Sequence, residues 1–156
     1  MRRKARPPTV VFESAEPKPR TRKGHDMTRA EVEADIRETL GLVLSMFNEV
    51  PDELIEHEWS LMKQIELGET LIPNKYKDLI GIAVSGATRC RYCAYFHAEA
   101  ARLFGATEEE IAEAALVAKN VMGWSTYLNA IQLDYNTFVA EVDQAAQYVR
   151  SQAAAA

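Results

Sequence analysis

Apolar residues recur at spacings of three or four positions along most of the chain, which is the period of an amphipathic α-helix. The first run follows Thr28 and Glu31, which match a capping box, and continues through Val32 and Ile36 to Phe47. No run alternates between apolar and polar residues over the length of a useful β-strand. The pattern predicts helices over residues 28–47, 51–67, 73–86, 88–104, 107–122, 124–135 and 137–152.

The segment 73–86 differs from the others because it carries apolar residues on most of its sides. These residues are Leu79, Ile80, Ile82, Ala83 and Val84. A helix that is apolar all round belongs in an interior, so we expect this segment at the centre of its domain. Together the patterns predict an all-α bundle in which short connections join antiparallel neighbours.

Residues 1–27 differ in composition from the rest of the chain. They hold eight Lys or Arg residues, three acidic residues and four of the six prolines. Subtracting them from the totals of 18 basic and 23 acidic residues leaves a net +5 arm and a net −10 helical domain over residues 28–156. The arm is either a solvated tail or an extension that packs on an acidic neighbouring subunit. The apolar residues Val10, Val11 and Phe12 favour the second interpretation.

Length and composition narrow the class of protein. The 156 residues are 47% hydrophobic and 26% charged, which is typical of one globular domain with a substantial core. The longest apolar runs fall far short of the ~20 residues that a transmembrane helix needs, and no secretory apolar stretch follows the basic N-terminus. We therefore expect a cytoplasmic protein without a membrane segment, and the acidic domain argues against nucleic acid as a partner.

The chemistry of the chain centres on its only two cysteines, Cys90 and Cys93, which begin a predicted helix. Two thiols three residues apart share a helical face, close enough for a disulfide, and a helix N-terminus stabilises a thiolate. His97 follows Cys93 by one turn and can exchange a proton with it. The alternatives are two buried core cysteines, or a zinc site to which Asp78 and His97 add ligands.

The stretch from Asp78 to His97 contains Cys-x-x-Cys followed by x-x-x-His, and a Gly-Ala-Thr turn follows at residues 105–107. This combination resembles the core of the alkylhydroperoxidase AhpD-like proteins, within the carboxymuconolactone decarboxylase superfamily, over about residues 76–118. The resemblance implies an all-helical subunit that assembles into homo-oligomers, trimers or hexamers. It also implies a dithiol peroxidase that reduces hydroperoxides without metal, haem or another cofactor.

The resemblance also implies a role for each candidate catalytic residue. Cys93 corresponds to the cysteine that attacks peroxide, Cys90 to the resolving cysteine, and His97 to the proton-relay histidine. Asp78 stands where the family usually has glutamate, and Tyr92 stands where some members carry histidine. An external dithiol must then restore the thiols, and the family suggests a lipoyl-bearing protein or a thioredoxin-like reductant.

Two other functions remain open from the sequence. A carboxymuconolactone decarboxylase-like lyase would need a general acid or base and an anion site, whereas the basic residues near the motif are Arg89, Arg91 and Arg102. A noncatalytic, redox-sensing oligomeric module would use the same cysteine pair. Four aromatic residues could line a substrate pocket, a core or a subunit interface, namely Tyr95, Phe96, Trp124 and Tyr127.

Overall fold

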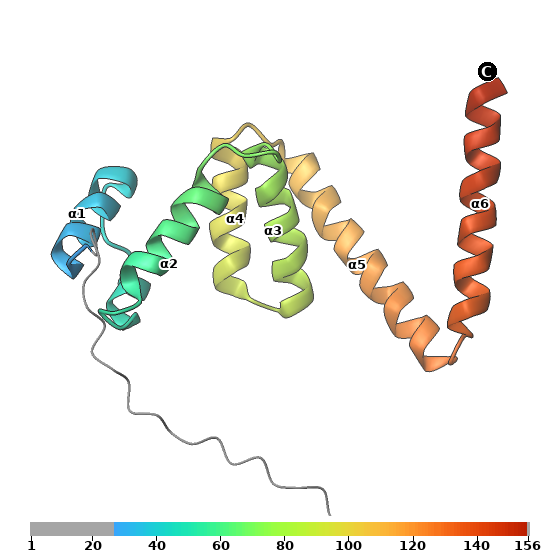
Figure 1. Cartoon of the computed structure of the whole chain (residues 1–156), viewed down its shortest axis with the longest axis horizontal. Coiled ribbons are helices and arrows are strands. Elements are labelled where there is room, and N and C mark those ends of the chain that lie inside the picture. The colour runs from blue at the N-terminus through green and yellow to red at the C-terminus, as the bar shows by residue number, and fades with distance from the viewer. Residues whose placement is uncertain (1–26, 156) are drawn as a thin grey trace, which may run out of the picture. The chain divides into compact units, whose positions relative to one another are not determined.

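The computed structural model describes residues 27–155, so the predicted arm lies outside the described residues except for Met27. The all-α prediction is confirmed, because residues 27–155 form six α-helices and no β-strand (Figure 1). These are α1 (Arg29–Leu40), α2 (Ile55–Met62), α3 (Asn74–Thr88), α4 (Arg91–Leu103), α5 (Glu108–Ala130) and α6 (Tyr135–Ala155). A 3₁₀-helix, η1 (Ser45–Glu49), precedes α2, and a π-helical turn, η2 (Lys63–Leu67), follows it.

The chain divides into two compact units, with the boundary between Ser60 and Leu61. The first unit is built around a small apolar core. In this core Phe47 meets Trp59 edge to face, with ring centroids 5.7 Å apart. The indole N–H of Trp59 donates a 2.8 Å hydrogen bond to Asp35, so the one polar atom of this buried ring is satisfied.

The predicted first helix is shorter than the sequence pattern suggests. Its capping box is confirmed, since Thr28 and Glu31 bond reciprocally to each other's backbone N–H groups. The helix then stops at Leu40, because Gly41 adopts a left-handed conformation with φ 82° and donates its N–H to Arg37. Phe47 still reaches the core, but it does so from η1 rather than from α1.

The second unit is organised around α3, as predicted, although Ile80 and Val84 of this helix are more than half exposed. This helix packs along both α4 and α5, and α3 and α4 lie side by side (Figure 1). Ile82 contributes to the buried apolar surface of α3. Three polar residues of the same helix are also buried, namely Asn74, Asp78 and Ser85. Buried polar groups are costly unless they are bonded, and Asn74 meets this need by donating a 2.8 Å hydrogen bond to the Leu67 carbonyl.

The predicted break at Gly123 is wrong, because α5 continues through this residue to Ala130. A glycine inside a helix costs only about 1 kcal/mol relative to alanine, which the surrounding helix formers outweigh. The chain turns instead after Ile131, where Gln132 has φ 53°. Asp134 then accepts a 2.8 Å hydrogen bond from the Thr137 N–H at the start of α6.

Candidate active site

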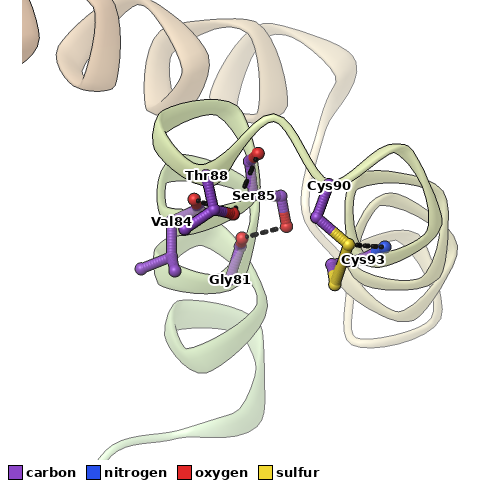
Figure 2. Close-up of a disulfide and its surroundings, with 6 residues drawn as sticks. All are labelled: Gly81, Val84, Ser85, Thr88, Cys90 and Cys93. Atoms are coloured by element: carbon purple, nitrogen blue, oxygen red, sulfur yellow. Dashed lines mark hydrogen bonds between the residues drawn. A yellow bond between two sulfur atoms is a disulfide. The ribbon is translucent and has the colours of Figure 1, made fainter.

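Cys90 lies in the tight connection between α3 and α4, and Cys93 lies in the first turn of α4 (Figure 2). Arg89 ends α3 in a left-handed conformation with φ 59°, and the Cys90 N–H then donates a 3.0 Å hydrogen bond to the Ser85 carbonyl. Sequence rules favour Thr88 as the cap of the next helix. The structure places Thr88 in the last turn of α3, where its hydroxyl donates to the Val84 carbonyl at 2.9 Å.

Cys90 itself caps α4, because its Sγ accepts a hydrogen bond from the Cys93 N–H at 3.2 Å. The two cysteines form a disulfide, with their Cα atoms 5.4 Å apart. Cys93 is exposed and Cys90 is half-buried, so the alternative of two buried core cysteines does not describe this pair. Both sulfurs lie at the N-terminus of α4, where unpaired backbone N–H groups and the helix dipole favour a thiolate in the reduced protein.

Asp78 and His97 form the second part of the site. Asp78 on α3 accepts a hydrogen bond from His97 on α4, with 2.9 Å between Oδ1 and Nδ1. Although the side chain of Asp78 is shorter than that of a glutamate, its carboxylate therefore reaches the imidazole without an intervening water. Asp78 is 3% exposed, and its second carboxylate oxygen has no hydrogen-bond partner among residues 27–155. Burial raises the pKa of Asp78, while the hydrogen bond from His97 and the charges of His97 and Lys77 oppose this rise.

The contact with Asp78 determines which nitrogen of His97 is available for chemistry. A carboxylate only accepts hydrogen bonds, so Nδ1 carries the proton and Nε2 of the neutral ring is left as a base. The side chain of His97 is 18% exposed, and Phe96 meets its ring edge to face with centroids 5.2 Å apart. Since His97 stands one turn after Cys93 on α4, this arrangement can supply and remove protons near the disulfide.

The sequence did not point to Gly81 or Ser85, although both share one face of α3 with Asp78. The His97 imidazole lies directly against Gly81, where a side chain would overlap it. The Ser85 hydroxyl donates a 2.6 Å hydrogen bond to the Gly81 carbonyl (Figure 2). The spacing of positions 78, 81 and 85 was the available signal, because residues at i, i+3 and i+7 lie on one side of a helix.

Other residues considered as site candidates are placed elsewhere. Trp124 and Tyr127 line a shallow hollow on α5, and Tyr95 is exposed on α4. In the part of the chain that the structure describes, no group of three or more His, Cys, Asp or Glu side chains is arranged to hold a metal ion. The site therefore consists of a dithiol at a helix N-terminus and a carboxylate and imidazole pair that joins α3 to α4.

Comparisons with known proteins find two similar structures and one similar sequence. A structure of the alkylhydroperoxidase AhpD core from Rhodospirillum rubrum is 28% identical, with a TM-score of 0.61, over 69% of this chain and 83% of that one. A structure from Methanobacterium thermoautotrophicum is 34% identical, with a TM-score of 0.50, over 56% of this chain and 97% of that one. "Uncharacterized protein 4 in cox locus" of Paracoccus denitrificans is 30% identical over 76 residues, which are 49% of this chain and 68% of that protein.

The family model of the carboxymuconolactone decarboxylase family matches residues 48–134, which include both cysteines, Asp78 and His97. The match covers more than half of the chain, and the similar AhpD core has the same helical fold. The chain therefore belongs to the carboxymuconolactone decarboxylase family, as an AhpD-like member.

Proposed function

We propose that the protein is a dithiol peroxidase, an oxidoreductase that reduces hydroperoxides with the Cys90 and Cys93 thiols. The observation that carries this proposal is the disulfide at the N-terminus of α4, on the same helix as a histidine that a buried aspartate holds. The similarity to the AhpD core supports it. In this proposal the catalytic residues are Cys93, Cys90 and His97, and Asp78 orients the histidine.

The proposed reaction begins with the reduced protein. His97 Nε2 accepts the Cys93 proton, directly or through water, and the Cys93 thiolate attacks the terminal oxygen of the hydroperoxide. The O–O bond breaks, Cys93 becomes a sulfenic acid, and the leaving alkoxide takes a proton from the His97 imidazolium to leave as an alcohol. Cys90 then attacks the Cys93 sulfur and expels hydroxide, which takes the proton of the Cys90 thiol and leaves as water. Two thiols thus give the two electrons that one peroxide takes.

The exposure of the two cysteine residues supports an order for the return to the reduced state. Cys93 is the more accessible of the pair, so the thiolate of an external dithiol reaches its sulfur first and forms a mixed disulfide there. Cys90 is then the leaving thiolate, and the Cys93 N–H is in position to donate to it. A second thiol of the reductant completes the exchange. We expect this reductant to be a lipoyl-bearing or thioredoxin-like protein.

We further propose that the protein is a cytoplasmic homo-oligomer, a trimer or hexamer, with residues 1–27 as an arm on the helical domain 28–156. The apolar side chains that α5 and α6 leave exposed support an oligomer. Among them are Leu116, Val121, Trp124, Tyr127, Phe138 and Val142. No helix among residues 27–155 is both long and apolar enough to cross a membrane.

Steady-state peroxide consumption tests the proposed activity. The reduced full-length protein is mixed with an organic hydroperoxide and a dihydrolipoyl or thioredoxin reducing system, and loss of peroxide is followed. We expect turnover in the native protein and almost none after Cys93→Ser. His97→Gln should slow turnover by at least about a hundredfold, because it removes the proton acceptor. His57→Gln is the matched control, since His57 is exposed on α2. Equal rates for native protein and Cys93→Ser would refute the activity.

A noncatalytic redox module is the alternative that the same experiment addresses. Such a protein would form its disulfide and remain oxidised, because it has no need to present the oxidised sulfurs to a reductant. Peroxide loss limited to one equivalent per subunit, in the presence of either reducing system, would favour that alternative. A carboxymuconolactone decarboxylase-like lyase would use His97 but would not require both thiols.

A further inference from the structure

Gly81 lies in the interior of α3, three residues after Asp78, and faces the imidazole of His97. A Cβ built on Gly81 would lie closer than 3.0 Å to three atoms of the His97 ring, a separation that real Cβ atoms essentially never show. The backbone of Gly81 has a negative φ, so glycine is not needed for the conformation of the helix. What its missing side chain provides is room for the ring.

We propose that Gly81 is a positioning residue. Its missing side chain lets the His97 imidazole lie against α3, close enough for Asp78 to accept a hydrogen bond from Nδ1. The consequence for peroxide reduction rests on the proposed function. The geometric claim does not, because it concerns which nitrogen of His97 carries the proton. Gly81 touches no reacting atom and acts only through His97.

Distances explain why the His97 ring must lie this close to α3. Carbon atoms in contact lie about 3.5–4.0 Å apart, so a methyl group at position 81 would push the ring away from α3 by at least about 0.5 Å. The hydrogen bond from Nδ1 to Oδ1 is 2.9 Å long, and such bonds extend to about 3.2 Å. If the ring moved that far from Oδ1 along the line of this bond, the distance between the two atoms would therefore exceed the range of a hydrogen bond. Asp78 cannot follow, since its carboxylate is short and 3% exposed.

The same geometry predicts a specific rescue. Glutamate at position 78 is longer by one methylene, which is about 1.5 Å, so it can reach a ring that alanine at position 81 has displaced. Asp78→Glu should therefore restore the contact in the Gly81→Ala background. A residue with only a structural role in helix packing would not show this pairing, because lengthening a buried side chain adds to the crowding.

Nitrogen-15 NMR of the reduced full-length protein tests the proposal without any peroxide. The chain has three histidines, so the His97 signals are assigned from their loss in His97→Ala. At about pH 8, where an ordinary imidazole is neutral, the shifts of the two ring nitrogens report which one carries the proton. Gly86→Ala is the matched control, because Gly86 is in the same helix and a Cβ there meets nothing within 4 Å.

We expect the native protein and Gly86→Ala to show the proton on Nδ1, Gly81→Ala to show a mixture of both forms, and the Gly81→Ala, Asp78→Glu double variant to recover the native pattern. The proposal is overturned if Gly81→Ala keeps the native pattern or if Asp78→Glu gives no recovery. A protein that reduces no peroxide but shows this pattern would refute the proposed function and leave the inference standing.

A stability measurement keeps the inference testable if Gly81→Ala does not fold. In the His97→Ala background the ring is gone, so Gly81→Ala should fold and raise the Tm by about 3 °C, as alanine usually does in a helix of a protein of this size. Gly86→Ala should give a similar rise in the same background. A lower Tm for Gly81→Ala without the imidazole would show that something other than His97 requires glycine there, and would overturn the inference.

Discussion

Replacement of Asp78 by asparagine isolates the charge that supports His97. The two side chains have nearly the same size, and the asparagine oxygen can still accept a hydrogen bond from Nδ1. A hydrogen bond to a charged group contributes about 1.5–3 kcal/mol and a neutral one about 0.5–1.5 kcal/mol. Asp78→Asn should therefore destabilise the imidazolium that forms when His97 takes the Cys93 proton by about 1–1.5 kcal/mol. This corresponds to about one pH unit, or about a tenfold slower reaction at neutral pH.

Thiol alkylation as a function of pH measures this loss without a peroxide substrate. We expect the alkylation profile of reduced Asp78→Asn to move toward higher pH by about one unit. Asp143→Asn, an exposed acid on α6, serves as the control for loss of one negative charge and should leave the profile unchanged. The effect must act through His97, so Asp78→Asn should have little effect in a His97→Gln protein. Superimposable native and Asp78→Asn profiles would show that the charge of Asp78 does not support His97.

Three further predictions concern the thiols, stability and assembly. Cys90→Ser should reduce one equivalent of peroxide and accumulate a sulfenic acid on Cys93 that a dimedone probe traps. Cys93→Ser should react far more slowly, and a native rate for this variant would reverse the roles of the two cysteines. Burial raises the pKa of Asp78 in the folded state above its ordinary value of 3.8, so the unfolded chain loses this proton first. The native protein should therefore lose stability relative to Asp78→Asn as the pH rises above 3.8, measured by urea unfolding. Trp124 is 57% exposed, and Trp124→Glu should reduce the sedimentation mass of a homo-oligomer; an unchanged mass would remove α5 from the interface.

Local rules read from the sequence were sufficient for much of the helical framework. The capping boxes at Thr28 and Thr107 define the starts of α1 and α5, because their bonds involve residues only three positions apart. The predicted central place of α3 agrees with its contacts to α4 and α5, although Ile80 and Val84 stay exposed. Proximity of Cys90 and Cys93 needs nothing beyond one helical turn.

Features that depend on contacts between helices were beyond such rules. Cys90 caps α4 although cysteine is not a favoured cap, because the turn at Arg89 directs its sulfur at the Cys93 N–H. The direct bond between Asp78 and His97 depends on how closely the His97 ring lies against α3, and the missing side chain of Gly81 leaves room for the ring there. No residue spacing within a single helix specifies how closely a ring on α4 lies against α3.

In the proposed reaction Cys90 and Cys93 act together as the two-electron donor to a peroxide. The most direct measurement is the intact mass and free-thiol count of the reduced protein after one equivalent of an organic hydroperoxide, sampled over time. We expect the mass to fall by two hydrogens, about 2 Da, both thiols to disappear together, and His97→Gln to slow this change. Folded protein that keeps both thiols, or that gains two oxygens as a sulfinic acid with the other thiol still free, would contradict it.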